Sequence, residues 1–282
     1  MKKCIVCGNK KSKFLYRNIG LLKCSNCSHI FYSDNLCIKK LNKLYGKNYF
    51  YGDEFRNYLA DKKVWQKNFK LRWQALRKFL DFKKHQRLLK IGCAYGLFLD
   101  LVKDNFNEIL GIDISSPAVK YVKQKLGFKA IRSNFVPRNF SKKRFDVVCF
   151  WDTIEHLKRP DLYLRKVRKS MNKGALLAIT TGDIGSLVAR IRGKKWRLIH
   201  PPTHLHYFSK KTITKLLNKN GFRVIYCRSC GYYRSLHHMI YIILSIRSNK
   251  KHWYNYIKNS KLIKGNFYLN LHDIIYVIAK KI

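Results

Sequence analysis

Residues 88–99 decide the fold of this 282-residue chain, and they read Leu88-Leu-Lys-Ile-Gly-Cys-Ala-Tyr-Gly-Leu-Phe-Leu99. The apolar run Arg87–Ile91 predicts a short buried strand, and apolar residues at helical spacing predict a helix from Leu97 onward. Between the two lies a glycine turn, Gly92–Gly96. A strand that enters a helix through such a turn points backbone N–H groups and the positive end of the helix at a bound ligand.

A second predicted strand, Ile109–Ile114, carries Asp113 about 20 residues after the glycine turn. A carboxylate at this position can accept hydrogen bonds from the hydroxyls of a ribose. The turn has the form G-x-x-x-G, which differs from the G-x-G-x-x-G of dinucleotide sites and from the lysine-bearing loop of triphosphate sites. The two segments together predict a doubly wound α/β fold that binds an adenosine-like ligand, and they disfavour hydride transfer and phosphoryl transfer.

Further elements follow at the intervals that such a fold requires. The pattern predicts strands at 145–150, 175–180, 223–226 and 274–279, and helices at 117–126, 161–171 and 209–220. Ser209 is the expected N-cap of the last helix, because its hydroxyl can accept a hydrogen bond from the first turn. Upstream, residues 45–84 are rich in aromatic and charged side chains and are expected to form one or two helices.

Four cysteines near the start of the chain form a C-x2-C-x16-C-x2-C pattern: Cys4, Cys7, Cys24 and Cys27. Each C-x2-C turn aims two thiolates at one point, and two such turns complete a tetrahedral metal site. Because four thiolates leave no position for water, we expect a structural zinc ion rather than a catalytic one. No signal peptide or long apolar segment is evident, so we predict a cytoplasmic protein whose other cysteines are thiols.

Several segments resemble the class I S-adenosylmethionine-dependent methyltransferases, including the type 11 and type 23 groups. The resemblance is strongest for the group that has an N-terminal zinc-binding module and includes C-methyltransferases of nucleotide-linked deoxysugars. It rests on residues 88–99 and on Gly111-Ile-Asp-Ile-Ser115, Phe145-Asp-Val-Val-Cys-Phe-Trp-Asp-Thr-Ile-Glu-His-Leu157 and His204-Leu-His-Tyr-Phe-Ser209. It covers almost the whole chain. The family implies an α/β, Rossmann-like seven-stranded sheet whose last strand is antiparallel, with a small zinc-ribbon-like module.

The resemblance also implies where S-adenosylmethionine would bind. The glycine turn, with Gly92, Cys93, Ala94, Tyr95 and Gly96, would wrap the methionine part of the cofactor. The ribose would lie against Asp113 and Ile114, the adenine between Asn134 and Phe135, and the floor of the site would be formed by Trp151 and Asp152.

The candidate catalytic residues are Glu155, His156 and His204, and His200 and His206 are further candidate bases. A sulfonium methyl group is already activated, so the protein has to hold the two reactants in line and remove a proton from the acceptor. Imidazole suits the second task because it titrates near neutral pH. For each histidine a purely structural hydrogen-bonding role is the alternative.

Two positions depart from the family pattern. Lys90 stands where the family usually has an acid, and Ala94 stands where glycine is common. A lysine would weaken the binding of a cationic cofactor unless it pairs with the methionine carboxylate or with a neighbouring acid. If it prevented binding, the chain would be a non-catalytic member of the fold. Alanine is compatible with the turn if its backbone conformation is ordinary.

The charge predicts an anionic partner. Lys and Arg outnumber Asp and Glu by 60 to 15, a net charge of +45, and no carboxylate occurs between Asp183 and Asp273. Part of this excess reflects general composition, yet repulsion over such a length is costly without screening or an anion. We favour a small phosphate-bearing acceptor, such as a nucleotide-linked sugar or a surface-polysaccharide intermediate. RNA is the alternative acceptor, and peripheral contact with an anionic membrane is a further expectation.

The predicted organisation is a zinc-binding module at 1–45, a helical linker at 46–85 and a methyltransferase core at 86–282. An insert at about 231–271 separates the last two strands. It contains an apolar stripe, followed by basic residues and by Trp253. Two interpretations stand side by side for it: a helix that packs over the active-site face, or an amphipathic helix that lies in a membrane interface.

Overall fold

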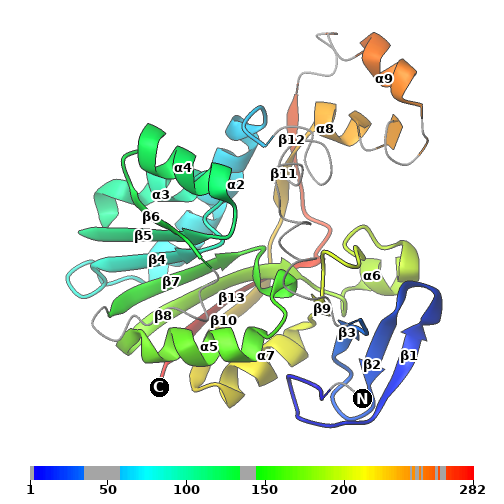
Figure 1. Cartoon of the computed structure of the whole chain (residues 1–282), viewed down its shortest axis with the longest axis horizontal. Coiled ribbons are helices and arrows are strands. Elements are labelled where there is room, and N and C mark those ends of the chain that lie inside the picture. The colour runs from blue at the N-terminus through cyan, green and yellow to red at the C-terminus, as the bar shows by residue number, and fades with distance from the viewer. Residues whose placement is uncertain are drawn as a thin grey trace.

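The computed structural model describes residues 3–34, 58–133, 144–241, 243–244, 248, 250–257, 260 and 265–282. A seven-stranded sheet lies at its centre, with the strand order β10-β13-β8-β7-β4-β5-β6 (Figure 1). The strands are β4 (Arg87–Ile91), β5 (Glu108–Asp113), β6 (Lys129–Arg132), β7 (Phe145–Trp151), β8 (Met171–Gly182), β10 (Phe222–Ser229) and β13 (Ile274–Lys281). β13 is antiparallel to both of its neighbours, and the remaining pairs are parallel. The predicted Rossmann-like sheet with an antiparallel last strand is confirmed.

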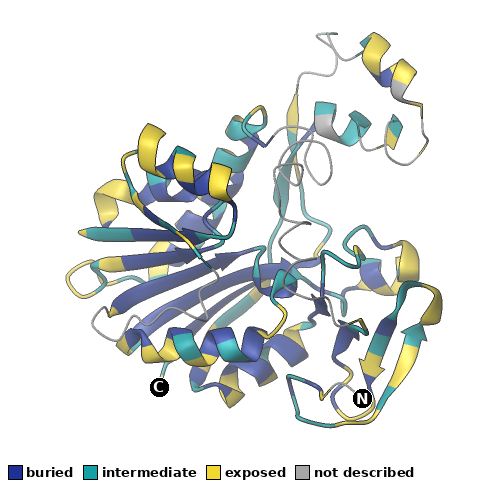
Figure 2. Ribbon diagram, in the orientation of Figure 1, coloured by how far each residue is buried: buried dark blue, intermediate teal, exposed yellow. Residues whose placement is uncertain are grey.

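Helices cover both faces of this sheet, which explains why its central strands are continuous apolar runs. In Figure 1, three helices lie on one face, namely α2 (Lys62–Leu76), α3 (Leu97–Val102) and α4 (Ser116–Lys125). The other face carries α5 (Pro160–Lys169) and α7 (Lys210–Lys219). All seven residues of β7 are buried (Figure 2). The Ser209 side chain accepts a hydrogen bond from Thr212 N, so its prediction as an N-cap is confirmed.

A second, smaller sheet contains the N-terminal residues. Its order is β1-β2-β3-β9, with β1 (Ser12–Tyr16), β2 (Leu21–Cys24), β3 (Ile30–Tyr32) and β9 (His206–Tyr207). Ile30 pairs with Tyr207, so the fourth strand comes from a segment almost 180 residues further along the chain. The N-terminal sheet is therefore completed by the core.

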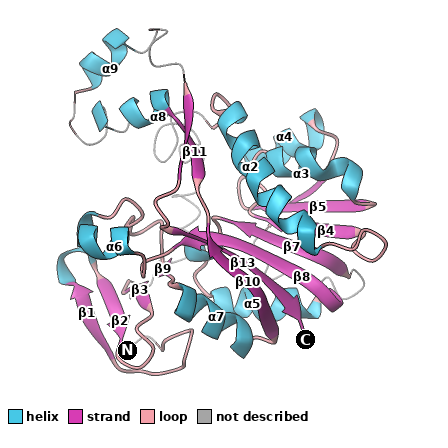
Figure 3. Cartoon of the chain, turned by 180° about the vertical axis from the view of Figure 1, so that it is seen from behind, coloured by secondary structure: helices cyan, strands magenta, loops and turns pink. Residues whose placement is uncertain are grey.

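The insert between β10 and β13 forms an arm, which we define as residues 231–271. It contains β11 (Tyr232–Ser235), α8 (Leu236–Tyr241), α9 (Lys251–Ile257) and β12 (Asn266–Leu269), and β11 pairs with β12. Figures 1 and 3 show α8 and α9 beyond the body of the molecule, at the far end of this two-stranded stem. These two helices therefore do not pack over the active-site face, and the sequence did not predict the stem.

Within the described residues, none of the helices is both long enough and apolar enough to span a bilayer. Of the predicted domain boundaries, the first one at residue 45 lies outside the described residues, and both boundaries remain predictions. The helix α2 falls inside the predicted helical linker.

Candidate active site

The glycine turn follows β4 and leads into α3, as predicted. The N–H groups of Gly92 and Cys93 donate hydrogen bonds to the Ile112 carbonyl oxygen at 2.8 and 3.0 Å, which ties the turn to the end of β5. Gly92 has a φ of +66°, and a Cβ at this residue would lie 2.6 Å from Thr153 Oγ1. Only glycine meets both conditions, because an L side chain would be strained and would also collide with Thr153.

Ala94 does not have the ordinary backbone conformation that its tolerance in the turn would require, because its φ is +46°. Left-handed backbone costs a residue with a Cβ about 1 kcal/mol or more. The Ala94 N–H donates to Asp113 Oδ2 at 2.8 Å, and the Ser115 N–H donates to Asp113 Oδ1 at 2.9 Å. Burial raises the pKa of Asp113, and these two N–H groups oppose the rise. The carboxylate is thus fixed between the glycine turn and the start of α4.

Lys90 forms no ion pair with an acid among the residues that the structure describes. Its side chain is buried, and Nζ donates to the carbonyl oxygens of Ile91 at 2.8 Å and Gly92 at 2.7 Å. Burial lowers the pKa of Lys90 to about 8, which the neighbouring Cys149 partly offsets. Of the alternatives for Lys90, the structure does not show pairing with an acid within the described residues: the ammonium lies at the start of the glycine turn and donates to the carbonyl oxygens of Ile91 and Gly92.

These residues fit S-adenosylmethionine. Asp113 is half-buried at the strand end, and each of its oxygens accepts one backbone N–H and keeps a lone pair for a ribose hydroxyl. Asp152 adds a carboxylate beside the neighbouring strand end, where it would attract a sulfonium. β4 is flanked by β5 on one side and β7 on the other, and ligands of doubly wound folds bind at such a switch point.

The structure locates the other predicted cofactor residues without testing their roles. Tyr95 is buried and its ring stacks on Tyr58 at 5.7 Å. Cys93 is buried and Ile114 is half-buried. Asn134 and Phe135 lie outside the described residues.

Trp151 is the last residue of β7 and Asp152 follows it, and their side chains have different surroundings. The Trp151 ring is buried and packs edge-on against Phe98 at 5.4 Å. Asp152 accepts hydrogen bonds from Arg72 Nη2 at 2.6 Å and from Thr180 Oγ1 at 2.9 Å. Its backbone is left-handed, with a φ of +48°, which turns the chain sharply at the strand end.

Arg72 was missed by the sequence analysis, although its position carried a signal. It lies on the apolar face of α2 between Phe69 and Trp73, and its side chain is only 4% exposed. The Tyr232 hydroxyl from the arm donates to Asp152 and lies against Arg72 as well. One turn earlier on the same face, the Asn68 side chain donates to Tyr233 O at 2.9 Å and accepts from Tyr233 N at 2.7 Å. A polar pair at i and i+4 on an apolar helix face indicates buried partners, and here the partner is the base of the arm.

A trio of side chains comes together beside the end of β7: Glu155, His156 and His204. One ligand-type atom of each lies within 4.8 Å of the others. The His156 and His204 rings meet edge-to-face with centroids 4.6 Å apart. Burial raises the pKa of Glu155 to about 8, with a further contribution from Asp152. Burial also lowers the pKa of His204 well below its ordinary value, and His156 adds to this effect.

The two remaining candidate bases lie elsewhere. His200 is exposed and its ring centroid is 5.8 Å from that of His204. His206 is buried in the N-terminal sheet, where its Nδ1 lies 3.1 Å from His29 Nε2. His206 is thus part of the contact between the N-terminal sheet and the core, and the structure does not bring it into the trio.

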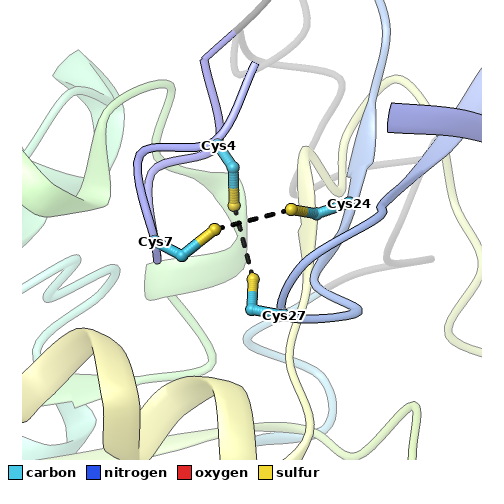
Figure 4. Close-up of side chains that lie close together, drawn as sticks. All are labelled: Cys4, Cys7, Cys24 and Cys27. Carbon is cyan, nitrogen blue, oxygen red and sulfur yellow. Dashed lines mark hydrogen bonds between the residues drawn. The ribbon is translucent and has the colours of Figure 1, made fainter. Parts of the chain in front are cut away.

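The four predicted ligand cysteines converge, as Figure 4 shows. The Sγ atoms of Cys4 and Cys27 are 3.6 Å apart, and those of Cys7 and Cys24 are 3.5 Å apart. These separations approach the edge of about 3.8 Å expected for a tetrahedron with metal–sulfur bonds of roughly 2.3 Å. Although burial opposes ionisation, backbone N–H groups of Cys27 and Asn26 lower the pKa of Cys24 to about 7. The cluster could hold a metal ion.

A family model described as "Methyltransferase domain" matches residues 64–226, which is more than half of the chain. The chain belongs to this methyltransferase family. The match begins in α2 and ends in β10, so it includes the glycine turn, Asp113 and the trio.

Curated relatives of this methyltransferase share moderate identity over part of their length. An uncharacterized protein of Methanocaldococcus jannaschii is 28% identical over 162 residues, which cover 57% of this chain and 65% of the relative. A ubiquinone biosynthesis O-methyltransferase of Pelagibacter ubique is 26% identical over 136 residues, which cover 45% of this chain and 55% of the relative. The chain therefore spans between half and two thirds of these relatives.

Solved structures support the fold of this methyltransferase over more of its length. The magnesium protoporphyrin IX methyltransferase of Synechocystis PCC 6803, solved with bound SAH, aligns with a TM-score of 0.56 at 12% identity. That alignment covers 86% of this chain and 99% of the other. An S-adenosylmethionine-dependent methyltransferase from Archaeoglobus fulgidus aligns with a TM-score of 0.52 at 22% identity, covering 79% and 99% of the two chains. At these identities the likeness concerns the class I methyltransferase fold.

Proposed function

We propose that this methyltransferase transfers the methyl group of S-adenosylmethionine to a small phosphate-bearing acceptor, such as a nucleotide-linked sugar or a surface-polysaccharide intermediate. When bound, the cofactor supplies an electrophilic methyl group on a sulfonium. The protein has to orient the acceptor and take up its proton. The observation that carries the proposed methyl transfer is the hydrogen bonding of the two histidines, because it leaves a ring nitrogen that can take up the acceptor proton.

Both histidines are oriented by backbone carbonyl groups. His204 Nδ1 lies 2.9 Å from Leu198 O, and His156 Nδ1 lies 2.9 Å from Thr203 O. A carbonyl oxygen can only accept, so each Nδ1 carries the proton and each Nε2 is the unprotonated nitrogen, which has the lone pair of a base. The lowered pKa of His204 keeps its imidazole neutral near pH 7. We therefore propose that His204 Nε2 takes the acceptor proton.

Glu155 is the proposed stabiliser of the imidazolium that then forms. Its Oε2 is buried and has no hydrogen-bond partner among the described residues. An adjacent positive imidazolium would lower the raised pKa of Glu155, because an opposite charge favours the ionised carboxyl. We propose that His156 positions the His204 ring through their edge-to-face contact.

Two arginines near the base of the arm support an anionic acceptor. Arg234 of β11 is largely buried and has no ion-pair partner among the described residues, and its guanidinium lies 5.9 Å from the Tyr232 ring. Burial, together with the nearby positive charge of Arg197, lowers the pKa of Arg234 to about 10. Arg197 pairs with Asp273 at 2.7 Å, yet its buried Nε has no partner within the described chain. Guanidinium groups in this state bind phosphate oxygens well, because the anion replaces the lost water.

RNA remains the alternative acceptor because of the net charge of +45. The relatives that carry functional names favour a small molecule, since they are named for ubiquinone biosynthesis. The trio is also partly enclosed, with Glu155 buried and His156 and His204 half-buried.

Two measurements test the proposal. Calorimetric titration with S-adenosylmethionine should show micromolar binding, and absence of binding would reject methyl transfer. Radiolabelled methyl transfer is then measured with nucleoside-diphosphate sugars, the corresponding free sugars and total tRNA. We expect label on the diphosphate sugars, with Arg234→Met raising KM about tenfold and leaving kcat largely unchanged. Label on tRNA alone would overturn the proposed acceptor class.

We also propose that the cysteine cluster holds a structural zinc ion. Four thiolates suit zinc and close its coordination shell, so the ion would stabilise the fold of the N-terminal sheet and take no part in methyl transfer. Metal analysis of the purified protein should give one zinc per chain, and Cys7→Ser should remove it.

A further inference from the structure

Two helices expose apolar side chains that nothing within the described residues covers. On α9, Trp253 is 56% exposed and Tyr256 is 86% exposed, and a spacing of three places them on one side of the helix. The opposite side of α9 is anchored, since buried Tyr254 packs against Tyr241 of α8 at 5.1 Å. The tip of the arm therefore presents an aromatic surface outward from a packed helix pair.

The second helix is α6 (Leu187–Arg192), which is joined to the body through its inner side. Its N-cap Ser186 accepts a hydrogen bond from Ala189 N, and Ala189 is buried in the cluster beneath the N-terminal sheet. On the outer side Leu187 is 71% exposed and Ile191 is 75% exposed, one helical turn apart. α6 thus offers a fixed aliphatic ridge to the solvent.

Both helices lie on the same side of the molecule. Figure 1 shows α6 and α9 along the right-hand edge, and the reverse view in Figure 3 shows both along the left-hand edge. The end labelled C lies on the opposite side in both views. Both helices therefore lie along one edge of the molecule in these views.

Positive charge accompanies both apolar surfaces. The sequence of the arm contains no Asp or Glu, and the exposed Lys250 directly precedes α9. Next to the α6 ridge, four basic side chains are exposed: Arg190, Arg192, Lys194 and Lys195. Each basic residue near an anionic lipid surface strengthens the attraction to it, and aromatic rings prefer the headgroup level.

We propose that α6 and the tip of the arm form one docking face that binds the surface of an anionic lipid bilayer. The aliphatic Leu187 and Ile191 favour lipid over nucleic acid, because they offer no ring on which a base can stack but can enter the acyl boundary. This proposal goes beyond methyl transfer, because it concerns where the protein works, and it does not depend on the identity of the acceptor.

Sedimentation of the full-length protein with lipid vesicles tests the proposal. We expect binding to vesicles that contain phosphatidylglycerol and little binding to phosphatidylcholine alone, with a decrease as salt is raised. The double variants Trp253→Ser/Tyr256→Ser and Leu187→Ser/Ile191→Ser should each weaken binding at least about tenfold, since each removes two inserted side chains. These side chains are exposed, so the variants should fold, as their circular dichroism and thermal unfolding would verify.

Ile282→Ser is the matched control, because Ile282 is 58% exposed at the end of the chain on the opposite side. It should bind vesicles like the parent protein. The proposal is overturned if the parent protein ignores anionic vesicles, or if both double variants bind as it does. Binding to polyuridylate in a gel-shift assay without vesicle binding would likewise overturn it and assign the basic surface to RNA. Calorimetry with S-adenosylmethionine on the same variants keeps this result separate from the proposed activity.

Discussion

The backbone N–H of Leu205 donates a hydrogen bond of 2.9 Å to the carbonyl oxygen of Glu155. The carbonyl oxygen of Leu205 in turn accepts a hydrogen bond of 2.9 Å from the N–H of Tyr32. Tyr32 ends β3, a few residues after the second cysteine pair. The cysteine cluster is therefore linked to the trio of Glu155, His156 and His204 through the backbone of β3 and the segment that precedes β9.

Loss of the metal should reduce turnover. We expect Cys7→Ser to remove the bound zinc, lower the melting temperature and reduce kcat at least about tenfold, because β3 helps to hold the Glu155 loop. The dissociation constant for S-adenosylmethionine should change much less, since the glycine turn is fixed by β5. Cys227→Ser, at a half-buried cysteine of β10, is the control. A metal-free Cys7→Ser protein with normal kcat would contradict the link.

His204→Asn should lower kcat by about 100- to 10,000-fold, the usual worth of a general base, and leave cofactor affinity intact. Burial lowers the pKa of His204 well below 6.5, and only the neutral imidazole can accept the proton. Activity should therefore be lost only when the pH falls to this lowered pKa. The pH–rate profile of kcat/KM measures this limb. His200→Asn should cause a far smaller loss, and an equal loss would move the base to His200.

Ala94→Gly should stabilise the protein by about 0.5–1 kcal/mol. The φ of +46° strains alanine more than glycine, and this relief exceeds the entropy that glycine adds to the unfolded chain. Urea denaturation measures the change. Ala118→Gly, in the interior of α4, should have the opposite sign, because its helical backbone gains nothing from glycine. Destabilisation by Ala94→Gly would contradict the strain at this residue.

Lys90 should make stability depend on alkaline pH. Its pKa is about 8 in the folded chain and 10.5 when exposed, so between these values the unfolded chain binds more protons. The free energy of unfolding therefore rises with pH across this window, by roughly 3 kcal/mol at most, and the contribution is absent below pH 8. Lys90→Met should lack this rise. If the free energy of unfolding depended on pH in the same way for both proteins, the pKa of Lys90 would not be lowered in the folded chain.

Arg72→Met should destabilise the protein by about 3 kcal/mol, because it leaves Asp152 without its ion-pair partner. This loss is at the lower end of the range for breaking a buried ion pair, because Asp152 is 34% exposed and water can solvate its carboxylate. Combining it with Asp152→Asn should recover part of the loss, and a double-mutant cycle measures the coupling. Additive effects would mean that the pair contributes nothing to stability.

The local signals in the sequence were sufficient for much of this molecule. The glycine turn, the position of Asp113, the positions of the central strands and the convergence of Cys4, Cys7, Cys24 and Cys27 depend on short-range periodicity and spacing. Such patterns are set by backbone geometry within a few residues.

Other features required the folded chain. The Arg72–Asp152 pair joins residues 80 positions apart, the β3–β9 pairing joins residues almost 180 apart, and the arm brings Tyr232 to Asp152. The left-handed Ala94 and the buried amine of Lys90 also escaped prediction, because a residue type states neither its backbone angle nor its neighbours.

The sequence by itself thus determined the fold class, the cysteine cluster and the edge of the sheet that carries the site. Only the tertiary structure decided which histidines share that edge. His204 and His206 are two residues apart, yet β9 turns His206 toward His29 while His204 meets His156. His204 lies before β9, where its N–H donates to the His200 carbonyl oxygen at 2.8 Å, so it does not share the strand geometry of His206. The partners of the two histidines come from distant parts of the chain, which no local pattern in the sequence states.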